Sequence, residues 1–208
     1  MTMGNESNLD SPSFDRARAD RLARHISALT YPTFYCIPVL IIISAALLPW
    51  PDWAAVAAVC IFFATVVPVS IVLAFTSRTH RGQLDIHERE ARLFPLLAII
   101  PSYAMGYASL YAMSAPAAIQ CLMLCYTINT AFVLAVSLFW KISIHAVGVS
   151  GPAVAMTYVF GSIGIVLMLM IPMVMWSRVH LKKHTVAQVI AGASSALTIT
   201  TLVFLVMT

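Results

Sequence analysis

The stretch from Pro152 to Trp176 decides the fold of this chain, and it reads PAVAMTYVFGSIGIVLMLMIPMVMW. It contains no charged residue, and it is longer than the roughly 20 apolar residues with which a helix crosses a bilayer. Glycines and a serine near its middle, from Gly161 to Gly164, are typical turn residues. The stretch therefore predicts membrane insertion, either as one long helix or as two short helices joined by a turn.

The rest of the chain has the same apolar character. Of its 208 residues, 61% are hydrophobic and only 10% are charged, and the mean hydropathy is +0.90. Soluble domains carry roughly 25% charged residues, so a soluble fold is excluded. We expect an all-α fold, a polytopic transmembrane helical bundle of six to seven membrane segments. The further apolar segments run from Tyr31 to Trp50, Trp53 to Thr76, Leu93 to Met113, Ala117 to Trp140 and His184 to Met207.

Residues 1–30 are polar, and arginines alternate there with aspartates. Because charges persist over this whole arm and no small-residue cleavage site follows, it is not a cleavable signal peptide. We expect a partly disordered N-terminal arm (1–30) that ends in an interfacial helix, followed by a transmembrane domain (31–208).

The net charge of +4 and the four cysteines each narrow the choice of partner. The cations lie beside apolar segments without a basic-aromatic stripe, which favours membrane lipids or a phosphorylated lipid over nucleic acid. The cysteines lie inside apolar runs, where a thiol packs as a small hydrophobe, and no cofactor or metal is expected at them. They are Cys36, Cys60, Cys121 and Cys125.

The chemistry is concentrated in three polar islands, Ser77 to Arg92, Lys141 to Gly151, and Ser177 to Lys183, the last followed at once by His184. Gln188 lies four residues after His184, so both share a helical face. Its amide oxygen can accept a hydrogen bond from one ring nitrogen and leave the other free as a nucleophile.

The neighbouring islands supply groups for a phosphate. Arg178 offers a planar guanidinium that suits phosphate oxygens. Lys141, Ser143 and His145 stand where a helix is expected to begin, and helix N-termini attract anions. The imidazole of His145 can donate a proton to a leaving group.

These residues resemble the type 2 phosphatidic acid phosphatase superfamily of membrane lipid phosphatases. Its signature is a Lys/Arg…Arg-Pro segment, then Ser-Gly-His, then Ser-Arg, five residues, His, three residues and Asp. The resemblance covers about residues 85–192, within an expected phosphatase-like core of about 85–207. The matching positions are Arg89, Arg92 and Pro95 for the first motif, Ser143 and His145 for the second, and Ser177, Arg178 and His184 for the third.

The resemblance implies a metal-independent phosphatase that acts on a lipid or isoprenoid phosphate or diphosphate through a phosphohistidine. By that resemblance His184 attacks phosphorus and His145 protonates the leaving alkoxide. The phosphoryl oxygens are then held by Arg89, Arg92, Lys141, Ser143 and Arg178. Charge stabilisation of this kind is the main device in phosphoryl transfer.

Two positions depart from the family pattern. Gln188 stands where the family has Asp, so a positively charged His184 lacks its compensating carboxylate. Ile144 replaces the Gly of Ser-Gly-His. Its side chain, which glycine lacks, hinders a close approach of the phosphate to the backbone. The chain is still expected to be an enzyme, a phosphoric monoester hydrolase, with slow catalysis, a shifted pH optimum or an inactive relative as the alternatives that these departures leave open.

The number of membrane passes decides whether such a site can exist. If residues 152–176 form one helix, His145 and His184 lie on opposite sides of the bilayer, roughly 30 Å apart. If the stretch turns back near Gly161, the arm and all three islands lie on one side. The two-helix version also satisfies the positive-inside rule, which places that side in the cytoplasm, with the cell membrane as the expected location.

Two other functions stay open at this point. An isoprenyl diphosphate-using transferase or synthase would hold Mg²⁺ on paired carboxylates, of which Asp85 and Glu88 are the nearest approach. A non-catalytic binder or transporter of lipid phosphate would agree with Gln188. The identity of the lipid and the oligomeric state do not follow from these patterns.

Overall fold

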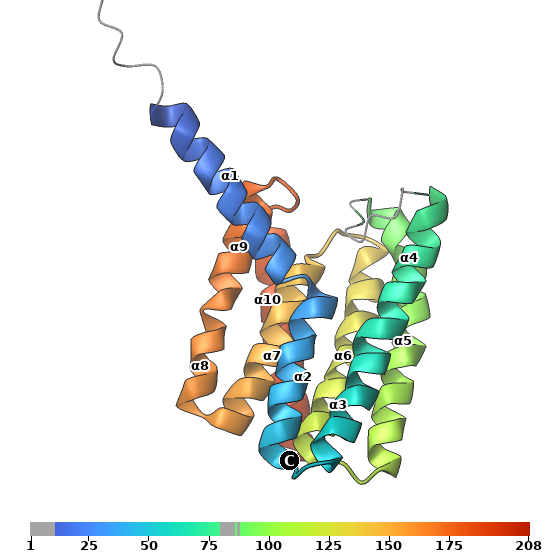
Figure 1. Cartoon of the computed structure of the whole chain (residues 1–208). Helices are drawn as coiled ribbons and strands as arrows, with labels where there is room; N and C mark the ends of the chain where they lie inside the picture. The colour runs from blue at the N-terminus through green and yellow to red at the C-terminus, as the bar shows by residue number, and fades with distance from the viewer. Residues whose placement is uncertain (1–10, 80–85, 87) are drawn as a thin grey trace, which may run out of the picture.

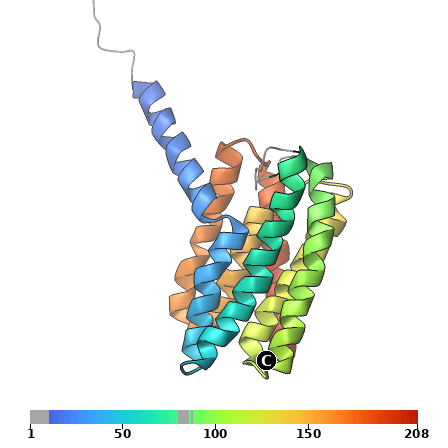
Figure 2. The same cartoon turned by 45° about the vertical axis from the view of Figure 1, so that its right-hand side comes forward.

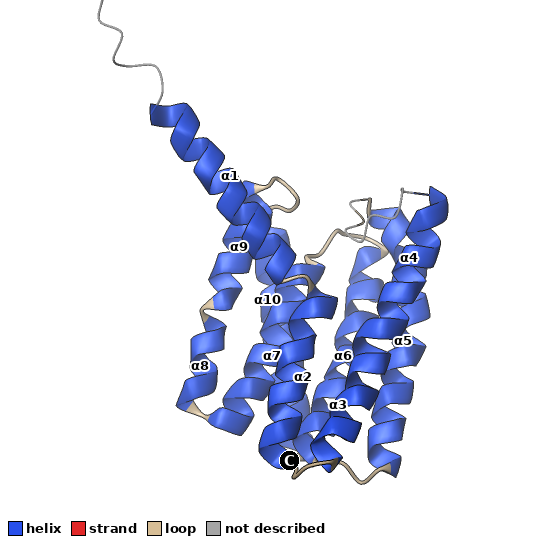
Figure 3. Cartoon of the chain, in the orientation of Figure 1, coloured by secondary structure: helices blue, strands red, loops and turns tan. Residues whose placement is uncertain are grey.

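The computed structural model describes residues 11–79, 86 and 88–208, and the side chains of 15–77, 86 and 88–208. In this part of the chain every regular element is a helix (Figure 3), which confirms the all-α class. The helices pack side by side as a bundle, with α1 projecting from one end (Figure 1). The expected disorder in residues 1–10 and the carboxylate of Asp85 fall outside the described residues.

Most helix bounds agree with the apolar segments to within a few residues, but the first helix of the 152–176 stretch begins at Ile144, eight residues earlier and inside the second polar island. The last apolar segment was expected to begin at His184, but its helix begins at Val186; His184 lies in the preceding loop, before the N-cap Thr185. The elements are α1 (Ser11–Leu29), α2 (Pro32–Leu47), α3 (Asp52–Ile61), the π-helix η1 (Phe62–Val66), α4 (Val67–Thr79), α5 (Arg89–Ala112), α6 (Ala117–Ser137), α7 (Ile144–Phe160), α8 (Ser162–Met168), α9 (Met170–His180) and α10 (Val186–Met207).

Five continuous helical segments within the described residues are long and apolar enough to cross a membrane. Two of them combine several elements: one is α3, η1 and most of α4, and another is α8 with α9. The pair α1 and α2 passes the same test only together and bends by 56° at its break, and α7 is a shorter apolar helix. The chain is therefore an integral membrane protein of five or six candidate spans beside the short α7. The five spans are Asp52–Ser77, Arg89–Ala112, Ala117–Ser137, Ser162–His180 and Val186–Met207.

The stretch that was ambiguous by hydropathy forms two helices joined by a turn at Gly161. Gly161 has φ +60°, a conformation that favours glycine, and its N–H donates to the Thr157 carbonyl at 2.9 Å. Gly164 lets α8 approach α7 closely, because a Cβ there would lie 2.3 Å from the Met156 carbonyl oxygen. Figures 1 and 2 show α7 and the α8–α9 segment running side by side in opposite directions, so the single-helix alternative is wrong.

This turn brings the polar islands to one end of the bundle. The ends of α4 and α9 and the starts of α5, α7 and α10 lie at the end where α1 projects, and the C-terminus lies at the other (Figure 1). Asp52, at the start of α3, is the one described charged residue at the far end. The structure thus removes the geometric objection to a site shared by His145 and His184.

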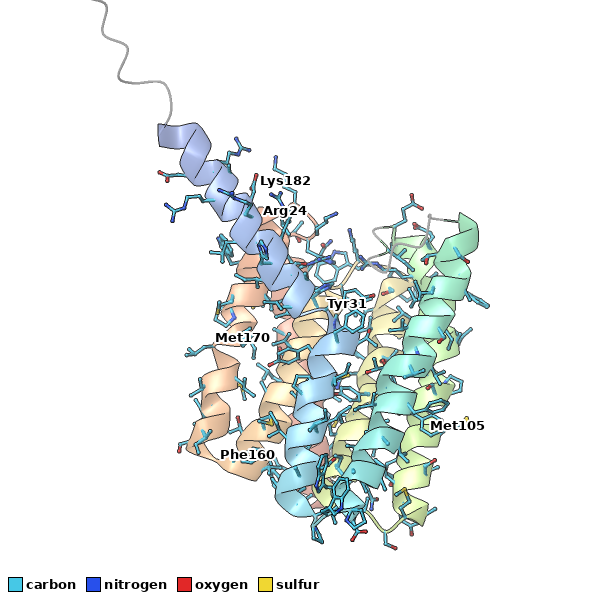
Figure 4. All side chains as sticks on the ribbon, viewed as in Figure 1. Arg24, Tyr31, Met105, Phe160, Met170 and Lys182 are labelled. Carbon is cyan, nitrogen blue, oxygen red and sulfur yellow. The ribbon has the colours of Figure 1, made fainter. Side chains whose placement is uncertain are left out.

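Helix α1 docks on α9. The Ser177 hydroxyl donates to the Ala23 carbonyl at 2.7 Å, and Ala23 is fully buried. Asp20 and His180 approach to 2.7 Å farther along the two helices. Arg24 of α1 and Lys182, which follows α9, are both labelled at this end of the molecule in Figure 4. The later part of the arm is therefore a packed helix that carries partners for α9.

Close helix packing positions the beginning of α7 against α10. A Cβ at Gly192 would lie 2.7 Å from the Ser143 carbonyl oxygen, so glycine is needed for this approach. The Ser143 N–H donates to the Gln188 carbonyl at 3.3 Å. These contacts hold the second island against the start of α10, close in sequence to His184. All four cysteines are buried and free.

Candidate functional site

A cavity of about 110 Å³ lies near the island end of the bundle and is lined by Arg92, His145 and His184. These three residues belong to α5, α7 and the loop before α10. The rest of its wall is mostly apolar and comes from α2, α4, α5 and α6. Each of the three motifs therefore contributes a predicted site residue to the wall of the same cavity.

His184 is held by Gln188 in one tautomer. The Gln188 Oε1 accepts a hydrogen bond from the Thr185 N–H at 3.1 Å and lies 3.1 Å from His184 Nδ1. Because an amide oxygen only accepts, Nδ1 carries the hydrogen in this contact. The lone pair is then on Nε2. The hydrogen bond that the i, i+4 spacing predicts is present.

The surroundings of His184 favour the uncharged ring. Its side chain is buried, and burial lowers the pKa of His184 most; nearby positive charges lower it further, from 6.5 to about 3. These charges belong to Arg92, Arg178 and Lys141. The hydrogen bond with Gln188 acts in the opposite direction and is the weakest influence. At neutral pH His184 is therefore a neutral base with a free nitrogen.

His145 stands in the first turn of α7. The Ser143 hydroxyl caps this helix by accepting from the Ala146 N–H at 3.4 Å. The imidazole is buried, and the ring of Tyr31 meets it edge-on with the ring centres 5.4 Å apart. Tyr31 also lines the cavity, and Figure 4 shows it near the island end. Sequence reasoning missed Tyr31, because nothing local links it to a helix more than 100 residues away.

Two buried arginines lie close to His184. Arg92 is 6% exposed, and its Nε donates to the Ile86 carbonyl at 2.5 Å. Arg178 is 1% exposed, and its Nη1 donates to the Ser27 hydroxyl of α1 at 2.8 Å. The Arg178 carbonyl also accepts from the His184 N–H at 3.3 Å, which ties the loop to the end of α9.

Of the predicted phosphate ligands only Arg92 lines the cavity; Arg178, although close to His184, lies outside the cavity wall, as do the other three. Arg89 is turned away: its guanidinium pairs with Glu90 at 2.6 Å and donates to the Leu138 carbonyl at 3.0 Å. Lys141 is half-buried in the loop before α7, and the Ser143 hydroxyl is the helix cap. Of the two arginines that sequence could not separate, the structure brings Arg92 to the cavity and leaves Arg89 outside it.

The arrangement combines a neutral imidazole with a free nitrogen, a second imidazole on the same cavity and a cluster of cations. Groups of these types suit a dianion, and imidazoles can act as a nucleophile or as a proton donor. Within the described residues no group of three His, Cys, Asp or Glu side chains is arranged to hold a metal ion.

Comparison of the chain with known protein families, with curated proteins and with solved structures gave no match.

Proposed function

We propose that the chain is a membrane phosphatase that hydrolyses a lipid or isoprenoid phosphate through a phosphohistidine, with chemistry like that of the type 2 phosphatidic acid phosphatase superfamily. The observation that supports it most is the convergence of His145, His184 and Arg92 on one cavity. The apolar wall of this cavity suits a hydrocarbon chain, and its charged end suits a phosphate.

In the proposed first step the Nε2 lone pair of His184 attacks phosphorus, and the bond from phosphorus to the ester oxygen breaks. His145, as imidazolium, gives its proton to the departing alkoxide. In the second step water attacks the phosphohistidine, His145 takes a proton from that water, and the N–P bond breaks. Arg92, with the charges of Arg178 and Lys141, stabilises the phosphoryl oxygens in both steps.

The nucleophile is tested by phosphate release from a panel of lipid phosphates in EDTA. We expect His184→Ala to lower kcat by about 10³-fold or more, as loss of a nucleophile does in other enzymes. His180→Ala is the matched control, because His180 pairs with Asp20 outside the cavity. Equal release from the wild type and His184→Ala would refute the assignment.

The intermediate and the phosphate ligand are tested in the same preparation. A labelled lipid phosphate should transfer acid-labile, base-stable phosphate to the wild type and none to His184→Ala. Arg92→Ala should raise KM and lower kcat together, by about 10²-fold in kcat/KM, because a charged hydrogen-bond donor to the phosphate is lost. Arg89→Ala is the control and should change kcat/KM less than about threefold.

Gln188 supports a second candidate, a non-catalytic binder of lipid phosphates. A neutral partner leaves the charge of a phosphohistidine uncompensated, which slows turnover and leaves binding intact. Saturable binding of a lipid phosphate without phosphate release over hours would favour this function. We further propose that the site faces the cytoplasm, because the polar islands carry the positive charge.

A further inference from the structure

A second cavity, of about 70 Å³, lies deeper in the bundle between α2, α5, α6 and α7. Five residues line both cavities, so the two are neighbours. The chain of a ligand whose phosphate lies at His184 would enter the second cavity by passing between these shared residues. The shared residues are Pro32, Leu96, Tyr103, Thr130 and Ile144.

Two residues of α6 that line this second cavity each carry a buried polar side-chain atom without a hydrogen-bond partner. These atoms are the hydroxyl oxygen of Tyr126 and the side-chain oxygen of Asn129, three residues apart on one face of the helix. The orientation of the Asn129 amide is set by its other contacts. Its nitrogen donates to the Cys125 carbonyl at 2.9 Å, and a carbonyl only accepts, so Oδ1 is the atom left over.

These groups lie well inside the membrane-spanning part. The Asn129 nitrogen also reaches the Thr200 hydroxyl at 3.3 Å, and a Cβ on Gly151 would lie 3.3 Å from that hydroxyl. Gly151 is six residues along α7 from His145, about 9 Å at 1.5 Å per residue. An unpaired hydroxyl or carbonyl in such apolar surroundings is costly, so an occupant that pairs with it is favoured.

We propose that Tyr126 and Asn129 form a hydrogen-bonding subsite for an oxygen function on the chain of the ligand. The Tyr126 hydroxyl donates to an ester, ether or hydroxyl oxygen, and a ligand hydroxyl can also donate to Asn129 Oδ1. The subsite therefore selects lipid phosphates that carry such an oxygen over isoprenoid phosphates that are hydrocarbon beyond the phosphate. This subsite rests on the proposed function, because that function places the phosphate of the ligand at His184.

The test compares two substrates and two tyrosine variants of the full chain in lipid nanodiscs. The substrates are an oleoyl glycerol phosphate, which carries an ester and a hydroxyl, and farnesyl phosphate, which carries neither. We expect Tyr126→Phe to lower kcat/KM for the glycerol phosphate about 5- to 10-fold, the usual effect of one lost hydrogen bond, with farnesyl phosphate changed less than about twofold. Tyr35→Phe is the matched control, because its hydroxyl is also buried without a partner but lies on neither cavity.

Equal effects of Tyr126→Phe on both substrates, or no effect on either, would overturn the subsite; water filling the cavity predicts such a result. If neither lipid releases phosphate, the proposed hydrolysis fails, and the subsite is decided by equilibrium binding of the same two lipids. A Kd for the glycerol phosphate that rises in Tyr126→Phe, with the farnesyl phosphate Kd unchanged, supports the subsite. Unchanged or equally raised values refute it.

Discussion

At the scale of single residues, Gln188 performs two tasks with one oxygen. Its Oε1 completes the capping box of α10 with Thr185 and also accepts from His184. Both bonds depend on the length of the side chain. The residue therefore orients His184 as an acid would but contributes no negative charge.

Gln188→Glu keeps this length and adds the charge. A carboxylate beside Nδ1 stabilises the imidazolium, so it raises the pKa of His184 above its present value of about 3. The acidic limb of kcat/KM should then move to higher pH, and kcat at neutral pH should rise about 10-fold or more, because the charge on the phosphohistidine is now compensated. The measurement is a pH profile of phosphate release for the wild type and the variant.

Gln188→Asp places the residue type of the family at this position, but its side chain is one carbon shorter. It should gain less than Gln188→Glu, because it cannot keep both hydrogen bonds at their present distances. A Gln188→Glu profile that overlays the wild type would show that the charge at this position does not limit the rate.

The contact between His184 and Gln188 could be predicted from sequence because it is local, four residues apart. The choice between Arg89 and Arg92 could not, although they are three residues apart on one helix. Arg89 is fixed outside the cavity by its ion pair with Glu90 and its hydrogen bond to the Leu138 carbonyl. Arg92 is fixed by its hydrogen bond to the Ile86 carbonyl. The Leu138 contact in particular comes from a segment far away in the chain.

At the scale of helices, the hairpin of α7 and α8 depends on two glycines with different functions. Gly161 has a positive φ, whereas Gly164 removes a Cβ that would collide with the backbone of α7. Glycines at this point predicted the turn. The docking of α1 on α9 could not be predicted, since an amphipathic segment with alternating charges is equally typical of a helix on the membrane surface.

Gly164→Ala should destabilise the protein by about 2 kcal/mol, because the new Cβ meets the backbone at Met156 and α8 must move away. Thermal unfolding in detergent measures the effect as a lower Tm. Ser162→Ala, an exposed change in the same turn, is the control and should stay within about 0.5 kcal/mol of the wild type. A Tm for Gly164→Ala equal to that of the control would contradict the close packing of α7 and α8.

At the scale of the whole molecule, the turn at Gly161 places the second and third islands at the same end of the bundle. Hydropathy identified the apolar segments but could not separate one long helix from two short ones in residues 152–176. The distribution of charge favoured two helices, because one long helix would place Arg178 and Lys182 on the other side of the membrane from the basic N-terminal arm.

Single-cysteine accessibility tests this arrangement. Lys141→Cys and Lys182→Cys should react with a membrane-impermeant maleimide from the same side, and Ser114→Cys from the other, because Ser114 follows α5 at the far end. The native cysteines are all buried, so the unmodified chain provides a low background. Labelling of positions 141 and 182 from opposite sides would separate His145 from His184 and exclude the site.

The near absence of charge at the far end also bears on how the chain enters the membrane. If the polar islands face the cytoplasm, as proposed, the turns between α2 and α3, α5 and α6, and α7 and α8, together with the end of α10, are the parts carried through the bilayer, and Asp52 is the one charged side chain described there. Each of these helix pairs can therefore insert as a hairpin whose cationic ends stay on the side of the polar islands. Insertion then moves almost no ionic charge through hydrocarbon, and a cation placed in any of these turns would oppose it.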